Sequence, residues 1–338
     1  MLSLNQVICL YVATVFTLAT GYNESNQTVY SPISIAAAYT DTHFKNSIRF
    51  EKYIDPVVTS DTPSCIIPFN RVGNLIVIKA KVDTTEGNFI LDTGAPRLIL
   101  NMTYFRHYHS HTEENESGGI TGGTSSNPTM VENFSFGPVK YYKAEADRVN
   151  LGHIENSKGI KILGLLGMQL FKRFEMIIDY EKSLIYLHLI NKKEASTYKS
   201  EMLNNESAYN TFPIKIVEDK LLTYGEIAGK KLTFIIDTGA ESNVLDSRLS
   251  NKIFEQVNIT RRIMLAGSGT QKIEALYGDM KNLKIGELAI STLPVLVTNL
   301  EKMCFSYDQC LDGMLGFDFL SLHKIGFNFV TRKMYIWK

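Results

Sequence analysis

The sequence that decides the fold occurs twice, as Phe89-Ile90-Leu91-Asp92-Thr93-Gly94-Ala95 and as Phe234-Ile235-Ile236-Asp237-Thr238-Gly239-Ala240. In each copy an apolar run, typical of a buried strand, leads to an aspartate in a Thr-Gly turn. A second, largely apolar run follows, Leu98-Ile99-Leu100 in one copy and Asn243-Val244-Leu245 in the other. A single motif of this kind is weak evidence, because three common residues recur by chance. Two copies in matching surroundings indicate that the two aspartates act together.

The segments around the two motifs recur in the same order along the chain. The motif aspartates are 145 residues apart, and Thr124 and Thr270, which follow glycine-containing stretches, are 146 apart. The segments Gly164-Leu165-Leu166-Gly167 and Gly313-Met314-Leu315-Gly316 are 149 apart. Offsets that drift by only a few residues indicate a tandem duplication of one β-rich lobe.

Short β-prone runs separated by glycine and polar turns make up most of the chain from Cys65 onward. This pattern predicts strands and hairpins rather than long helices. Short helices are expected within Met102–His109 and at Met168–Phe174. A polar, charged segment between the two copies predicts a linker at residues 191–210.

The N-terminus differs from the rest of the chain. Val7–Ala19 is an apolar run without charge, too short to span a bilayer comfortably and typical of the central region of a secretory signal. A buried N-terminal helix is the alternative. We expect an exported protein, periplasmic or secreted, with no membrane span once the signal is removed. The expected divisions are a signal peptide at 1–21, an arm or pro-segment at 22–64, lobe 1 at 65–190, the linker, and lobe 2 at 211–338.

The composition is that of an ordinary globular protein. Of the 338 residues, 44% are apolar and 21% charged, and 35 Lys and Arg balance 35 Asp and Glu. This excludes general disorder and gives no sign of a nucleic-acid or anionic-membrane partner. Cys304 and Cys310 flank a short loop and form either a disulfide or two core thiols. Cys65 is then unpaired, and Cys9 leaves with the signal.

Two carboxylates that share one proton supply both roles that peptide hydrolysis needs. One activates a water molecule as a base, and the other protonates the leaving nitrogen as an acid. Like charges held close together cannot both ionise cheaply, so the pair retains a proton. The candidate catalytic residues are Asp92 and Asp237. Hydroxyls that tie the two loops together and glycines that permit tight turns are expected to support them: Thr93, Thr238, Gly94 and Gly239.

A glycine-containing stretch follows each motif and predicts a hairpin tip that can close over a substrate. The first tip is richer in glycine than the second, so either both tips or only the first acts as a flap. The candidate substrate-binding residues are Gly118, Gly119, Ile120, Gly122, Gly123, Gly267 and Gly269.

Taken together, these features resemble the retropepsin-like aspartic proteases, in a tandem single-chain form with the two-lobed arrangement of pepsin. The resemblance rests on both Asp-Thr-Gly-Ala motifs, the Gly-Gly-Ile-Thr-Gly-Gly tip, and the Leu-Leu-Gly and Met-Leu-Gly segments. It covers roughly Cys65 to Lys338. It implies an all-β, bilobal fold with closed barrels and short helices, and an Asp92/Asp237 dyad with a bound water. The implied substrate is a peptide or unfolded protein held as an extended strand, with no metal or organic cofactor.

The chain departs from that family just after each motif. Pro96 and Glu241 stand where a small polar residue is common in the family. A charge on Glu241 near the dyad is expected to alter the pH optimum. Arg97 is expected to be an exposed loop charge rather than a determinant of specificity.

Two alternatives stay open alongside a monomeric endopeptidase with intramolecular lobe pairing. One is a catalytically silent peptide-binding module, in which the carboxylates are splayed or covered by the N-terminal arm. The other is a dimer in which lobes pair between chains.

Other polar and aromatic groups are explained more simply. The alternating histidines in His107–His111 invite a metal site, but a solvated polar loop is the favoured interpretation. Tyr141 and Tyr277 either line the cleft or pack in the core, and ordinary packing is favoured.

Overall fold

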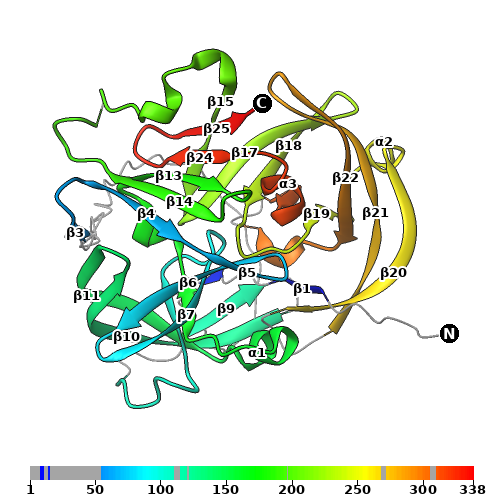
Figure 1. Ribbon diagram of the computed structural model, residues 1–338. Helices are drawn as coiled ribbons and strands as arrows, with labels where there is room; N and C mark the ends of the chain where they lie inside the picture. Colours follow the sequence, from blue (N-terminus) through cyan, green and yellow to red (C-terminus); the bar gives the residue numbers. More distant parts are fainter. Residues whose placement is uncertain are drawn as a thin grey trace, which may run out of the picture.

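The computed structural model describes residues 8–10, 14–15, 55–109, 115–119, 122–195, 197–267, 272–304 and 310–338. Within these ranges the chain is mostly β-strand, arranged as two lobes with a shared sheet beside them (Figure 1). The expected bilobal all-β fold is confirmed.

The first lobe is a sheet that curls until its two sides meet. Strand β10 pairs with β11 and also with β6, where Phe134 lies opposite Val82, so the sheet closes as a barrel. In spatial order its described strands are β2 (Thr14–Val15), β9 (Asn115–Gly119), β10 (Gly122–Phe136), β11 (Val139–Val149), β8 (Leu98–Asn101), β12 (Gly164–Leu166), β7 (Thr85–Leu91), β6 (Leu75–Val82) and β5 (Asn70–Val72), with β3 (Val57–Val58) beside β11.

The second lobe follows the same strand order. It closes where Glu226 of β17 lies opposite Lys284 of β21. Its described strands are β1 (Ile8–Leu10), β20 (Val257–Gly267), β21 (Lys272–Ile285), β22 (Leu288–Thr298), β19 (Asn243–Asp246), β23 (Gly313–Leu315), β18 (Lys230–Ile236), β17 (Lys220–Ile227) and β16 (Lys215–Val217). Strands β1 and β2 are the described part of residues 1–21, and the signal peptide stays a prediction.

A third sheet takes strands from both halves of the chain. Strands β13 and β24 meet at its centre in antiparallel register, with Glu175 opposite Asn328 and Ile178 opposite Ile325. Its order is β15 (Tyr209–Pro213), β25 (Lys333–Trp337), β24 (Ile325–Asn328), β13 (Phe174–Asp179), β14 (Leu184–Leu189) and β4 (Ser64–Pro68). Because three strands of each half join at the β13–β24 pair, this sheet holds the two lobes together.

Burial follows the strand pattern. In β11, buried Val139 and Tyr141 alternate with exposed Lys140 and Tyr142, as expected where one face meets the core. Strands β8 and β12 are buried at every position, because both of their faces are covered. The runs next to the two aspartates are therefore interior strands with little freedom to move.

Helices are short, as the sequence predicts. The described ones are α1 (Gly152–Lys158), η1 (Met168–Phe171), η2 (Glu201–Leu203), η3 (Glu206–Ala208), α2 (Asn251–Phe254), η4 (Glu301–Met303) and α3 (Phe317–Leu320). None of the described helices has the length and apolar character needed to cross a membrane.

The helix expected within Met102–His109 was wrong, and the segment consists of turns. The side chain of Asn101 is the reason: its Oδ1 accepts the N–H of Thr103 (3.1 Å) while its Nδ2 donates to the carbonyl of Ile162 (2.9 Å). This local bond competes with helix formation.

The structure decides whether Cys304 and Cys310 are a disulfide or two core thiols. Cys304 and Cys310 form a disulfide, with Cα atoms 4.0 Å apart, directly after η4. Cys65 in β4 is free, and burial raises the pKa of its thiol to about 11. A thiol with so high a pKa is a poor nucleophile.

Glu175 makes the stability of the shared sheet depend on pH. Its side chain is 2% exposed and accepts a hydrogen bond from Asn328 Nδ2 (3.0 Å), and burial raises its pKa to about 7. The pKa of Glu175 is higher in the folded protein than in the unfolded chain. The stability that protonated Glu175 contributes is therefore complete below about pH 4.3 and is lost as pH rises through 7. We expect the Glu175→Gln variant to have the same free energy of unfolding as the wild type at pH 4. At pH 8.5 its free energy of unfolding should be about 1–3 kcal/mol higher, because Gln cannot ionise.

Urea unfolding at the two pH values measures this difference. Replacement of exposed Glu132 by Gln is the matched control and should change neither value. An equal effect of Glu175→Gln at both pH values would show that ionisation of Glu175 is not responsible.

Candidate active site

Equivalent strands deliver the two aspartates. Asp92 follows β7 and its N–H donates to the carbonyl of Leu166 in β12 (3.0 Å). Asp237 follows β18 and its N–H donates to the carbonyl of Leu315 in β23 (3.0 Å). Both aspartates are 0% exposed. Each loop is thus anchored to an interior strand at its base.

The two loops bind each other through their threonines. The N–H of Thr93 donates to Thr238 Oγ1 (3.0 Å), and the N–H of Thr238 donates to Thr93 Oγ1 (3.1 Å). Each hydroxyl in turn donates to a carbonyl of the opposite lobe, Thr93 to Ile236 (2.8 Å) and Thr238 to Leu91 (2.9 Å). These four bonds fix the relative position of the loops, as the sequence predicts for hydroxyls at these positions.

The motif glycines leave room for the opposite carboxyl. A Cβ on Gly94 would lie 2.5 Å from Asp237 Oδ2, and a Cβ on Gly239 would lie 2.5 Å from the carboxyl carbon of Asp92. Any side chain there would push the aspartates apart. Gly94 and Gly239 also donate their N–H groups to the Oδ1 of the preceding aspartate, at 2.9 and 2.8 Å.

The two carboxyls titrate as a pair. Burial raises the pKa of Asp92 well above its ordinary value, and the charge of Asp237 and a hydrogen bond between the two carboxyls raise it further. Burial raises the pKa of Asp237 to about 6, against the opposing effect of the Gly239 N–H. Because two buried charges in contact repel strongly, the pair retains one proton where an isolated aspartate would be ionised.

Two further glycines let neighbouring backbone approach the loops. A Cβ on Gly167 would lie 2.1 Å from the carbonyl oxygen of Arg97, and a Cβ on Gly316 would lie 2.6 Å from that of Ala240. The Leu-Leu-Gly and Met-Leu-Gly segments therefore need glycine because of a backbone contact, which the sequence alone did not reveal.

Glu241 does not place a free charge next to the pair. Its side chain is 8% exposed and forms an ion pair with Lys158 of α1, and its carbonyl accepts a hydrogen bond from Asn74 Nδ2 (3.2 Å). Both partners come from the other lobe, and no pattern in the sequence predicted that they contact Glu241. The expected effect of Glu241 on the pH optimum stays a prediction, now with Lys158 as the counter-charge.

Arg97 was expected to be an exposed loop charge, but it is partly buried. Its side chain is 27% exposed, and its Nε lies 3.4 Å from Asp147 Oδ2. Tyr141 is buried and donates to the carbonyl of Leu170, so it belongs to the core. Tyr277 is half-buried and stacks under the guanidinium of Arg261, 4.5 Å from the ring centroid.

The glycine-containing tips lie on paired strands. Gly119 pairs with Gly122 and Gly118 with Gly123 across β9 and β10, and Gly267 ends β20. Ile120 and Gly269 lie outside the described residues. The described part of the chain holds no cluster of three or more His, Cys, Asp or Glu side chains suited to a metal, and His111 lies outside it.

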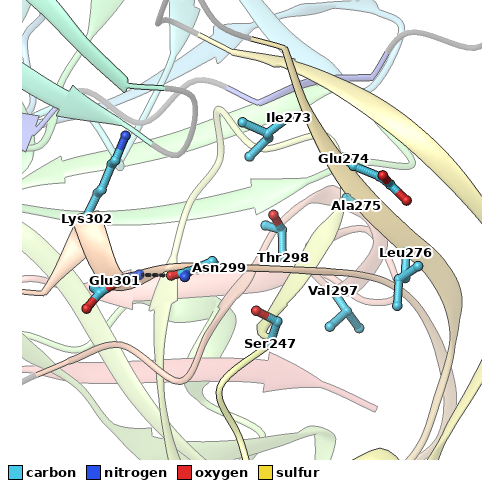
Figure 2. A pocket seen from close by; sticks show the side chains of 10 residues that line it. All are labelled: Ser247, Ile273, Glu274, Ala275, Leu276, Val297, Thr298, Asn299, Glu301 and Lys302. Carbon is cyan, nitrogen blue, oxygen red and sulfur yellow. Dashed lines mark hydrogen bonds between the residues drawn. The ribbon is translucent and has the colours of Figure 1, made fainter.

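A pocket of about 440 Å³ opens in the second lobe, where β21 and β22 separate. Figure 2 shows Ile273 to Leu276 along one side and the segment from Val297 to Lys302 along the other. Its lining is mixed: Ile273, Ala275, Leu276 and Val297 are apolar, Ser247, Thr298 and Asn299 are polar, and Glu274, Glu301 and Lys302 are charged. It lies near the tip of the β20–β21 hairpin, and neither aspartate lines it.

One comparison with known proteins gives a match. An aspartyl protease family model matches residues 223–319, from β17 to α3. The matched part contains Asp237-Thr238-Gly239, and the first motif lies outside it. No curated protein matches the chain. The similarity supports a general aspartic protease function, and that family implies peptide substrates.

The threonine contacts predict energetic coupling between the loops. Thr93→Val and Thr238→Val each leave a buried N–H and a buried carbonyl without a partner, so each should destabilise the protein by about 1–3 kcal/mol. Both changes disrupt the same network. The loss of unfolding free energy in the double variant should therefore be smaller than the sum of the losses in the two single variants, by at least about 0.5 kcal/mol.

Urea unfolding of the two single variants and the double variant measures the coupling. Thr211→Val, at an exposed position in β15, is the control and should change stability by less than about 0.5 kcal/mol. Strictly additive losses would contradict the reciprocal contact.

Proposed function

We propose that the protein is an aspartic endopeptidase in which Asp92 and Asp237 share one proton and activate a water molecule. The contact between two fully buried carboxyls that titrate together carries this proposal. Such a pair has few structural uses, because it costs stability through repulsion and desolvation. A role in acid–base chemistry would explain why the protein keeps a carboxyl pair that lowers its stability.

The residues divide the reaction as follows. The ionised carboxylate takes a proton from water, whose oxygen attacks the peptide carbonyl carbon, while the protonated carboxyl gives its proton to the carbonyl oxygen. Collapse of the resulting diol breaks the C–N bond. The proton first taken from water passes to the leaving nitrogen, and one diol hydroxyl returns its proton to the other carboxylate as the new carbonyl forms. The pair ends with one proton, as it began. The threonine contacts hold both carboxyls in place throughout.

An extended peptide is the proposed ligand, held under the tips at Gly118–Gly123 and Gly267–Gly269. The outer strands of both hairpins accept an added strand: β1 pairs parallel with β20, and β2 pairs antiparallel with β9. Strand addition supplies affinity through main-chain hydrogen bonds with little dependence on sequence. This supports a peptide or unfolded-protein substrate.

The remaining expectations belong to the same proposal. The protein works as a monomer whose lobes, at 65–190 and 211–338, pair within one chain through the segment 191–210. It is exported after loss of residues 1–21, and residues 22–64 form an arm or pro-segment. The silent peptide-binding alternative needs carboxyls that are splayed or covered by the N-terminal arm, and the contact between Asp92 and Asp237 argues against the splayed form.

Cleavage of an unfolded protein such as reduced casein, followed from pH 3 to pH 8, tests the activity. Asp92→Asn and Asp237→Asn should each lower kcat/KM by about 10³-fold or more without unfolding the protein, and pepstatin should inhibit the wild type. Activity needs one proton on the pair, so it should fall as pH rises above the raised upper pKa and again at low pH as a second proton binds.

Replacement of exposed Asp61 by Asn is the matched control and should retain full activity. Full activity in both dyad variants would overturn the proposal, as would the absence of cleavage at every pH, including after removal of the residues before Cys65.

A further inference from the structure

Three polar side chains form a continuous hydrogen-bonded chain at the edge of the shared sheet. Ser64 of β4 lies opposite His188 of β14 in antiparallel register, and its Oγ lies 2.7 Å from His188 Nδ1. His188 Nε2 lies 3.3 Å from Oε1 of Glu194, in the segment that follows β14. One tautomer satisfies both contacts, because Nε2–H then donates to Glu194 and Nδ1 accepts from the serine. The Ser64 hydroxyl therefore faces a nitrogen that can take its proton.

The histidine ring of this chain is fixed from two sides. It stacks on Tyr198, with 3.6 Å between the ring centroids and 5° between the planes. Glu194 Oε1 also accepts the N–H of Asn191 (2.8 Å), which holds the carboxylate beside Nε2. His188 is 8% exposed, and burial lowers its pKa against the opposing effect of Glu194. The ring is thus neutral at pH 7 and available as a base.

The serine, unlike the histidine, is exposed. The turn before it fixes its backbone: Ser60 Oγ donates to the carbonyl of Thr62 (2.7 Å), and Thr62 Oγ1 donates to the carbonyl of Ser64 (3.1 Å). A small molecule can therefore reach the Ser64 hydroxyl from solvent, while the base behind it stays largely buried.

The main chain supplies a hydrogen-bond donor at the same place. In the described part of the chain, β4 is the last strand of the shared sheet. The N–H of Leu189 donates to the carbonyl of Pro63 (2.9 Å). The N–H of Phe69 donates to the carbonyl of Ser183 (3.1 Å), so the odd-numbered residues of this segment bond to β14. Because these bonds alternate along an antiparallel strand, the N–H of Ser64 points to the open edge.

An apolar surface lies next to the serine on the same face of the sheet. Side chains two residues apart share a face, so Ile66 lies beside Ser64, and Tyr186 beside His188. Ile66 and Tyr186 are opposite each other in register; Ile66 is 55% exposed and Tyr186 is half-buried. A short aliphatic group packed on Ile66 loses contact with water and brings its reactive end beside Ser64.

We propose that Ser64, His188 and Glu194 form a second catalytic site, which hydrolyses small aliphatic esters through an acyl–serine intermediate. Attack by a serine, assisted by a histidine base that a carboxylate orients, recurs on unrelated folds and is identified by geometry rather than by sequence order. Ser64 is the nucleophile, His188 the general base and Glu194 the positioning residue. The site shares no residue with the aspartate pair, so it does not depend on the proposed peptidase function.

The reaction runs in two steps that return the site to its starting state. First, Ser64 Oγ bonds to the ester carbonyl carbon as its proton passes to His188 Nδ1. The bond from that carbon to the alcohol oxygen then breaks, and the proton passes to this oxygen. Second, water attacks the acyl carbon and gives a proton to Nδ1, which returns it to Ser64 Oγ as the acid leaves. In both steps the Ser64 N–H donates to the oxyanion.

The donor set decides which substrates react. Each donor of an oxyanion hole contributes about 10²–10³-fold to kcat. Among the described residues we identify one donor, the Ser64 N–H. The site therefore acts on esters with good leaving groups, such as nitrophenyl esters, and not on amides, whose leaving amine needs more stabilisation of the intermediate. A short acyl chain fits the surface beside Ile66.

Hydrolysis of p-nitrophenyl butyrate by the full chain tests the activity through release of nitrophenol. Ser64→Ala and His188→Asn should each lower kcat/KM by about 10²-fold or more. An Asn at 188 still offers the Ser64 hydroxyl an acceptor but cannot take its proton, so a merely structural contact would survive this change. Glu194→Gln keeps an acceptor for Nε2–H without the charge and should lower kcat by at least about tenfold.

The pH profile separates a catalytic base from a structural contact. The rate should rise with pH through a midpoint below 6.5, the ordinary histidine pKa, because His188 must lose its proton and burial lowers its pKa. The charged groups that face the ring are Glu194 and Glu175, which lies opposite His188 in β13. Tyr198 stays neutral in this range, because burial raises its pKa.

Pepstatin and a matched serine separate this site from the rest of the protein. Pepstatin should inhibit the peptidase and leave ester hydrolysis unchanged. Replacement of Ser291, an exposed serine in β22, by Ala should retain the wild-type rate.

Covalent labelling gives a second measurement that needs only the wild type. A fluorophosphonate should modify the protein at Ser64, as identified by mass spectrometry of the labelled peptide. Ester hydrolysis that persists in Ser64→Ala, a label on another residue, or neither turnover nor label would overturn the inference. The peptidase is judged separately by casein cleavage, so failure of one activity leaves the other standing.

Discussion

The structure depends on a reciprocal hydrogen bond between two loops. Thr93 and Thr238 each accept the backbone N–H of the other, and this contact holds two buried carboxyls together. Two like-charged groups would otherwise separate, or admit water, to lower their energy. Glycines at 94 and 239 allow the approach, and interior strands on both sides prevent the loops from relaxing away.

Other contacts between the lobes reinforce this one, but they are not symmetric. On one side Lys158 and Asn74 of the first lobe bind Glu241 of the second. On the other side Asp219 of the second lobe accepts a hydrogen bond from Gln169 Nε2 (2.8 Å) of the first. Two barrels with the same strand order thus meet through different chemistry.

Sequence analysis predicted the fold class, the paired aspartate turns and the glycine hairpin, because each depends on local chemistry repeated in order. It failed where a distant partner decides the outcome. Met102–His109 lost its helix to the side chain of Asn101. Sequence analysis also gave no sign of the ion pairs that Glu241 forms with Lys158 and Arg97 with Asp147, because each partner lies about fifty or more residues away along the chain.

The sequence by itself determined which residues form interior strands, where the chain turns, and that two Asp-Thr-Gly turns occur in equivalent surroundings. These properties follow from side-chain periodicity and from the backbone freedom of glycine, both of which act over a few residues. Only the tertiary structure decided the hydrogen bonds between the turns, the raised pKa values of Asp92 and Asp237, and the ion pairs of Glu241 and Arg97. Burial and Coulomb interactions depend on distance in space, and residues far apart in the sequence set that distance only once the chain has folded.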